Sequence, residues 1–113
     1  MPLYTLTMST SVRDIKARIT LLTSAEGGRT SPAKNGYRPQ FYYDKEQWDA
    51  AIELIGKEEI SPGESQVVFF QFATPKNHVN RLRSGKQFEL KEGPKTVAVG
   101  EVLEIIDLAE RGV

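Results

Sequence analysis

Cysteine is absent from the 113 residues of this sequence, histidine and tryptophan occur once each, and there is no long apolar run. Without cysteine the chain has no disulfide, no thiolate nucleophile and no thiolate metal ligand, and a single histidine argues against a transition-metal site. No apolar stretch approaches the roughly 18 residues of a membrane-spanning helix, and the N-terminus does not resemble a secretory signal. We therefore predict a cytoplasmic protein without a metal or a membrane segment.

Net charge is absent too, because 15 basic residues balance 15 acidic residues. This balance argues against a strongly nucleic-acid-binding chain. The charges are nevertheless segregated: residues 27–43 carry three cations, residues 44–64 carry seven acids against two lysines, and residues 65–88 carry four cations. Such segregation predicts either a bipolar surface whose field steers partners or neighbouring strands of opposite charge that neutralise one another. The second interpretation is the simpler one.

What the sequence does contain is a series of short segments with a two-residue period, separated by turn residues. Its length and its 39% hydrophobic and 27% charged residues are ordinary for one folded domain. In residues 15–21, Ile15, Ala17, Ile19 and Leu21 alternate with other side chains, as in a half-buried strand. Further strands are expected at 3–8, 37–44, 65–74, 86–91 and 96–106. About six strands ended by turns predict an all-β barrel or sandwich.

Some positions leave this pattern open or interrupt it. Residues 44–56 fit a helix and a strand equally well, because Trp48 and Ile52 lie on the apolar face in both periods. Pro39 cannot donate a ladder hydrogen bond, so it predicts an edge or a bulge, and Gly100 predicts a bend or a bulge in the last strand. The C-terminal tail is expected to curl into a short helix.

Catalytic machinery is not evident. The pair Gly27-Gly28 follows a strand, as a phosphate-binding loop does. The later residues of that motif, a further glycine followed by lysine and Ser/Thr, are missing, so a turn with positive φ is predicted instead. His78 lies in a basic loop and is expected to be a surface residue, and no nucleophile elbow accompanies it. Carboxylate pairs such as Glu58-Glu59 lie in a charged turn that is typical of solvated surface. We predict no enzymatic activity, no nucleotide and no cofactor.

Binding residues are predicted along residues 37–44, where side chains alternate between two faces. Tyr37, Phe41 and Tyr43, together with the intervening proline, are predicted to face the core. Arg38, Gln40 and Tyr42 then place a guanidinium, an amide and an aromatic ring on the other face, a set that can hold phosphate and ribose groups or stack on a base. The alternative is a solvated face with one amphipathic tyrosine. Loop 76–86 would add cations to the same partner.

Four motifs carry a resemblance to a known family. In order and spacing, EGGR, GYRPQFY, PGE and FELKEGPKTVAVGEV resemble the C-terminal, third domain of bacterial elongation factor Tu. The resemblance covers residues 14–106. It implies an all-β fold, a six-stranded antiparallel closed Greek-key β-barrel, with a strand rather than a helix around Trp48. The expected division is an N-terminal arm at 1–12, the barrel at 13–107 and a tail at 108–113.

The resemblance also implies where RNA would bind. In the family this barrel contacts the T-stem backbone of aminoacyl-tRNA through the arginine of GGR and the glutamine of GYRPQFY, which Arg29 and Gln40 match. Thr30 and Thr74 depart from the family, which has histidine and lysine there, and the loop after Pro75 is longer and more basic. The full set of candidate RNA-binding residues is Arg29, Thr30, Arg38, Gln40, Tyr42, Lys76, Arg81, Arg83, Lys86, Lys91 and Lys95.

Two functions follow as hypotheses. The factor's GTPase domain has no counterpart in the twelve residues that precede the matched part, so the resemblance implies a free-standing barrel without GTPase activity. The first hypothesis is a non-enzymatic module that binds tRNA or another structured RNA in a translation-related role. The alternative is a protein-interaction module that mimics the factor's barrel and engages a protein partner without RNA.

Overall fold

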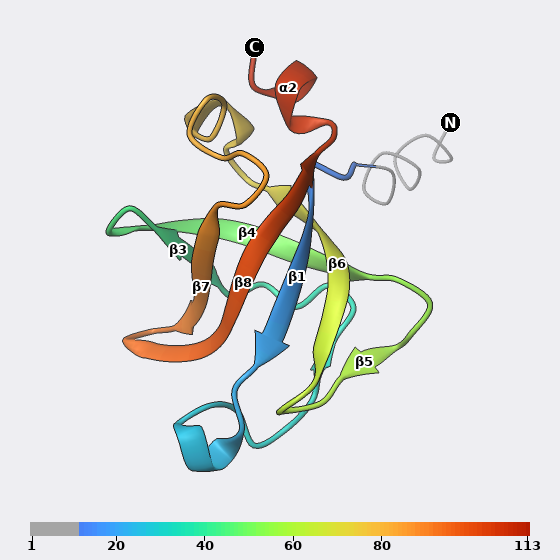
Figure 1. Cartoon of the computed structure of the whole chain (residues 1–113), viewed down its shortest axis with the longest axis vertical. Coiled ribbons are helices and arrows are strands. Elements are labelled where there is room, and N and C mark those ends of the chain that lie inside the picture. The colour runs from blue at the N-terminus through green and yellow to red at the C-terminus, as the bar shows by residue number, and fades with distance from the viewer. Residues whose placement is uncertain (1–11) are drawn as a thin grey trace, which may run out of the picture.

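The structure, a computed structural model, describes residues 12–113, so the strand expected at 3–8 lies outside the described residues. Within them the chain forms strands, two short 3-10 turns and one helix (Figure 1). In chain order these are β1 (Ile15–Leu21), η1 (Ser24–Glu26), β2 (Ala33–Lys34), β3 (Gln40–Tyr43), β4 (Glu46–Leu54), β5 (Glu59–Ile60), β6 (Ser65–Phe72), η2 (Pro75–Asn77), β7 (Gln87–Glu92), β8 (Lys95–Ile105) and α2 (Leu108–Arg111).

Six of the strands close into a barrel in the order β1-β6-β4-β3-β7-β8, and all of their pairings are antiparallel. Strands β3, β4 and β6 follow one another as neighbours, and β1 lies beside β6, which is the Greek-key order. β2 and β5 form a separate two-stranded sheet. The predicted all-β Greek-key barrel is confirmed. Closure leaves no open strand edge in this sheet.

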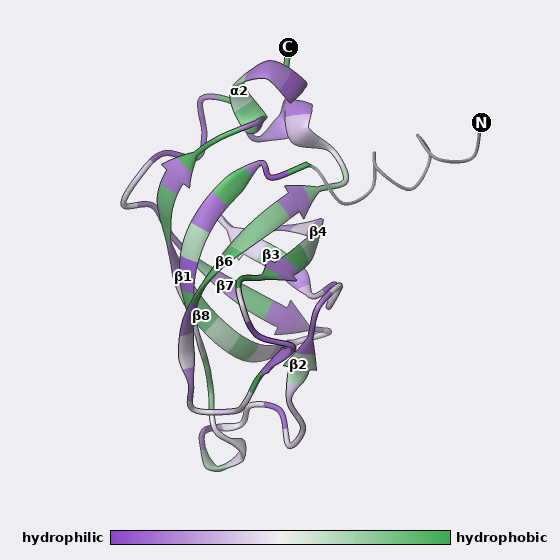
Figure 2. Cartoon of the chain, turned by 90° about the vertical axis from the view of Figure 1, so that its right-hand side faces the viewer, coloured by the Kyte–Doolittle hydropathy of each residue, from purple (hydrophilic) through white to green (hydrophobic). Residues whose placement is uncertain are grey.

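Alternation of burial explains why these segments are strands. In β1 each core residue is followed by a more exposed one, and Figure 2 shows the same alternation of hydrophobic and hydrophilic bands along the barrel strands. The ambiguous stretch around Trp48 is strand β4, in which Ala50, Ile52 and Leu54 are buried at a period of two. β3 begins only after Pro39, because a proline nitrogen has no hydrogen to donate to the ladder. The strand predicted for residues 37–44 is therefore shorter than expected.

Aromatic rings fill the barrel, and Gly100 makes room for one of them. The ring of Phe41 meets the edges of Phe70 and Phe72 at centroid distances of 5.1 and 4.9 Å and stacks on Phe88 at 4.1 Å. A Cβ at Gly100 would lie 2.4 Å from Cζ of Phe88. The ladder runs in regular register through Gly100, and the irregularities of β8 lie elsewhere. Of the two alternatives predicted at Gly100, a bend or a bulge, the register contradicts the bulge, and close packing against Phe88 requires the glycine.

His78 is another correction, because the structure buries it completely. The loop of residues 73–86 folds back over one end of the barrel, and the imidazole stacks on Phe72 at 4.1 Å and meets the edge of Trp48 at 4.8 Å. Its Nδ1 lies 2.7 Å from the hydroxyl oxygen of Tyr43. The prediction of a surface histidine rested on the polar residues around it in the loop. The sequence does not show that the loop covers an aromatic end of the core.

A buried carboxylate attaches the C-terminal helix to the same end of the barrel. Asp14 is fully buried and accepts hydrogen bonds from the backbone N–H of Phe72 at 2.8 Å and from Nε of Arg111 at 2.7 Å. Nη2 of Arg111 also donates to the carbonyl oxygen of Phe72 at 3.1 Å. The predicted short helix of the tail is therefore present as α2, and it is held across the ends of β1 and β6.

Candidate nucleic-acid interface

The structure brings candidates from distant parts of the sequence together on the outer faces of β3 and β7. The register pairs Gln40 with Lys91 and Tyr42 with Glu89, so these side chains share one face. Nζ of Lys91 lies 4.2 Å from the ring centroid of Tyr42, a cation–π contact. Nε2 of Gln40 donates to Oδ1 of Asp49 at 2.8 Å, which fixes the amide and leaves its oxygen free to accept.

Three further candidates are exposed, although no side-chain contact in the described part of the chain joins them to this group. Thr30, Arg38 and Lys95 are exposed, and none of them forms an ion pair or side-chain hydrogen bond within residues 12–113. Lys95 faces Glu92 across the β7–β8 turn, and Arg38 directly follows Tyr37, whose hydroxyl donates to Glu92. We call the set formed by Arg38, Gln40, Tyr42, Lys91 and Lys95 the β3–β7 surface.

Arg29 lies beside this surface, but its side chain is engaged in the fold. The guanidinium donates to the carbonyl oxygens of Ser31 and Pro32, to Oγ of Ser31 and to Glu92. These four hydrogen bonds use four of the five N–H groups of the guanidinium. It also lies 4.7 Å from the ring of Tyr37. Burial is the largest single cause and opposes the charge, but the hydrogen bonds and charges of Glu92 and Tyr37 together raise the pKa of Arg29. Arg29 therefore orders the loop before β2 and has one N–H left for a ligand.

The glycines before Arg29 have two different roles. Gly27 has φ of 88° and ends η1, so the predicted turn is confirmed at this position. Gly28 is not in the left-handed region; it is buried, and a Cβ there would lie 2.3 Å from the carbonyl oxygen of Leu22. The second glycine is thus required because the backbone passes close to β1. This contact sets the position of Arg29.

Substituting the two glycines should separate these roles. Gly28→Ala is expected to lower the free energy of unfolding by about 2 kcal/mol, because backbone atoms have to move away from the new methyl group. Gly27→Ala is expected to cost about 1 kcal/mol, since its Cβ would meet no atom and only the positive φ is unfavourable. Urea denaturation of the two variants measures the difference. Equal values would show that the approach of Gly28 to Leu22 imposes no strain.

The cations of loop 76–86 lie at the other end of the barrel. In Figure 1 this loop, coloured gold to orange, lies beside α2, whereas the cyan segment that contains η1 lies at the opposite end. The structure therefore does not bring loop 76–86 and Arg29 together. Lys76 and Arg83 are exposed and form no ion pair within residues 12–113, whereas the other two cations of the loop are paired.

Acids of the β3–β4 turn neutralise those two cations. Nη2 of Arg81 donates to Glu46 at 2.7 Å, and Nζ of Lys86 donates to Asp44 at 2.7 Å. The hydrogen bond from Lys86 lowers the pKa of Asp44. The simpler interpretation of the segregated charges, in which neighbouring segments neutralise one another, is confirmed here. Arg81 also lies over the ring of Tyr43 at 5.0 Å, so it helps to hold the loop in place.

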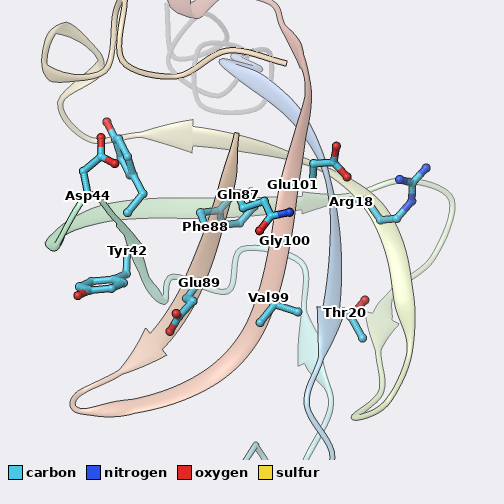
Figure 3. Close-up of a pocket in the computed structure, with 11 residues that line it drawn as sticks. Arg18, Thr20, Tyr42, Asp44, Gln87, Phe88, Glu89, Val99, Gly100 and Glu101 are labelled. Atoms are coloured by element: carbon cyan, nitrogen blue, oxygen red, sulfur yellow. The ribbon is translucent and has the colours of Figure 1, made fainter. Parts of the chain in front are cut away.

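A hollow that was not predicted from the sequence lies on the outer face of β3, β7, β8 and β1 (Figure 3). It has a volume of about 500 Å³, and its lining includes Arg18, Thr20, Tyr42, Glu89, Val99 and Glu101. Val99 is an apolar side chain that is 44% exposed. An apolar residue at an outward position was the one available signal. The hollow itself depends on the register of four strands, which the sequence does not reveal.

Residues 12–113 contain no group of three or more His, Asp or Glu side chains arranged to hold a metal ion. No helix in that part of the chain has the length and apolar character needed to cross a membrane.

The fold and the motifs on its surface allow the family to be assigned. The protein forms a closed six-stranded Greek-key barrel, and its sequence matches a domain of a translation factor. It is therefore a translation-factor-like β-barrel module. The chain belongs to the Elongation factor Tu C-terminal domain family, whose model matches residues 8–106. The match confirms the resemblance seen in the motifs and covers every strand of the barrel. Helix α2 begins beyond the matched residues.

Proposed function

We propose that this protein is a non-enzymatic module that binds tRNA or another structured RNA through the β3–β7 surface, in a translation-related role. The observation that carries the proposal is the meeting of Gln40, Tyr42 and Lys91 on one face, although β3 and β7 are far apart in the sequence. Arg38 and Lys95 add exposed cations without carboxylate partners in the described part of the chain. The family resemblance assigns RNA contact to the glutamine that Gln40 matches.

Each residue type of this surface suits one part of an RNA backbone. Arg38, Lys91 and Lys95 supply positive charge for phosphates, which dominate the affinity of protein–nucleic acid contacts. The free amide oxygen of Gln40 can accept a hydrogen bond from a ribose 2′-hydroxyl, the group that distinguishes RNA from DNA. Arg29 contributes by ordering the adjacent loop. With about three phosphate contacts and zero net charge, the expected affinity is modest and strongly dependent on salt.

Filter binding of bulk tRNA to the full chain tests the proposal. The logarithm of the binding constant is expected to fall with the logarithm of salt concentration with a slope between about −2 and −3. Replacing Lys91 and Lys95 together by alanine should weaken binding at low salt by about tenfold or more and make the slope shallower.

The matched control replaces the two unpaired cations at the other end, Lys76 and Arg83, by alanine. This variant loses the same charge but should keep the wild-type affinity. If tRNA does not bind at low salt, or if both double variants weaken binding equally, the β3–β7 surface is not an RNA site.

The second candidate function is a protein-interaction module, and the hollow in Figure 3 favours it. An apolar side chain exposed in a concave surface is a feature of protein contacts. A partner bound there should co-purify in stoichiometric amount after nuclease treatment and should be lost with Val99→Lys. Retention of the partner by this variant would exclude the hollow as its binding site.

A further inference from the structure

An apolar cleft of about 360 Å³ opens between loop 73–86 and α2, at the end of the barrel away from η1. Its apolar lining consists of Val79, Leu82, Ile105, Leu108 and Ala109. Asn80 and Arg83 complete the lining with polar groups. A cleft of this volume lies in the lower range of ligand pockets and admits one or two apolar side chains.

Both walls of the cleft are fixed from within the protein. Arg111 and the buried Asp14 hold α2, while the buried His78 holds the loop against the aromatic core. The loop and helix also touch directly, because a Cβ at Gly112 would lie 1.8 Å from Cγ2 of Val79. A cleft held in this way is preorganised, so a ligand would not have to order its walls on binding.

The loop wall of the cleft carries positive charge. Residues 73–86 contain no acidic residue. Four of the seven arginines of the chain, Arg13, Arg29, Arg81 and Arg111, form ion pairs within residues 12–113. Arg83 forms none in that part of the structure and is exposed beside the apolar lining. A ligand that presents a carboxylate next to an apolar side chain would complement both features of the site.

We propose that this cleft docks a peptide segment of a partner protein, with an apolar side chain in the cleft and an adjacent Asp or Glu on Arg83. The site is distinct from the proposed RNA-binding site, because none of its lining residues belongs to the β3–β7 surface. One of its walls, α2, also lies beyond the residues that match the family. The barrel would thus hold RNA on one surface and a protein segment on another.

Fluorescence polarisation with two labelled peptides tests this assignment. The first probe is acetyl-Gly-Glu-Leu-Phe-Glu-Gly-amide, and the second carries lysine in place of both glutamates. The acidic peptide is expected to bind the full chain about tenfold more tightly than the basic one, and Arg83→Glu should remove this preference. Lys76→Glu is the matched control, since it makes the same charge change in the same loop outside the cleft lining and should change affinity less than about twofold.

NMR spectra of the full chain locate the peptide. Amide shifts confined to Val79, Leu82, Ile105, Leu108 and Ala109 and their neighbours would support the proposal, as would loss of binding in Ala109→Arg with an otherwise unchanged spectrum. Equal affinity for both peptides, equal loss in Lys76→Glu, shifts on another face, or no shifts at millimolar peptide would each overturn it. Unchanged tRNA binding by Arg83→Glu would confirm that the two functions are separate.

Discussion

Asp14→Ala is expected to lower the free energy of unfolding by about 4 kcal/mol, the largest effect of any substitution considered for this protein. Asp14 is fully buried, and its carboxylate accepts hydrogen bonds from the guanidinium of Arg111 and from the backbone N–H of Phe72. Its removal leaves a cation without its partner and a buried N–H without an acceptor. Urea denaturation measures the loss, and the cleft beside α2 should stop binding the acidic peptide.

A double-mutant cycle shows whether the ion pair is responsible. Arg111→Met should also destabilise the protein, because it leaves a buried carboxylate unpaired. The double variant should be more stable than the sum of the two single losses by about 1–3 kcal/mol, since it leaves no unpaired charge. Glu110→Ala, on the exposed side of α2, should change stability by less than about 0.5 kcal/mol. Additive losses would show that Asp14 acts only through Phe72.

Acidification is expected to remove about 3 kcal/mol of stability between pH 7 and pH 4 through His78 alone. Burial is the main cause that lowers the pKa of His78 from its ordinary 6.5 to about 4; Arg81 acts in the same direction and Glu46 opposes it. The unfolded chain therefore takes up a proton near pH 6.5 that the folded protein refuses until about pH 4. Stability is complete above the unfolded pKa and is lost as pH falls toward the folded one.

His78→Phe should flatten this pH dependence, because phenylalanine can stack on Phe72 without titrating. The interval from pH 7 to pH 5 is the most informative, since the carboxyl groups whose pKa values are lowered in the fold, such as Asp44 and Glu92, titrate below it. Tyr43→Phe is the control: it removes the contact with Nδ1 but leaves the histidine buried, so the slope should remain. An equal slope in wild type and His78→Phe would assign the pH dependence to other groups.

Both predictions concern the same end of the barrel, where loop 73–86 and α2 are attached to the core. The β3–β7 surface lies on the barrel strands and does not use Asp14, His78 or Arg111. A substitution that loosens α2 is therefore expected to leave tRNA binding intact while it removes peptide binding. This separation allows the two proposed sites to be tested one at a time in the same chain.

The barrel strands were predictable because each is encoded locally. Ile15 to Leu21 alternate in burial as they alternate in sequence, and the same period in Ala50 to Leu54 describes β4 once the helical alternative is set aside. The period alone did not decide between helix and strand around Trp48; the family resemblance did. The errors in the fold prediction arose where a residue packs against a segment that is distant in the sequence, as when Gly100 makes room for the ring of Phe88.

The candidate site was predictable in part. The outward position of Gln40 and Tyr42 follows from strand alternation, and the structure places both on the outer face. That Lys91 lies over Tyr42 could not be read from the sequence, because it depends on the pairing of β3 with β7. Arg29 was predicted as an RNA-binding residue from the family resemblance, and its engagement with Glu92 was not foreseen.

The sequence by itself determined which faces of the strands are apolar, where the turns fall, and that no cysteine chemistry is available. These properties depend on residue types and on spacing along the chain. Only the tertiary structure decided which charges are neutralised and which remain free. The partners of Arg29 and Arg111 lie 63 and 97 positions away, at Glu92 and Asp14. Barrel closure brings such residues together, and no local pattern records which pairs will meet.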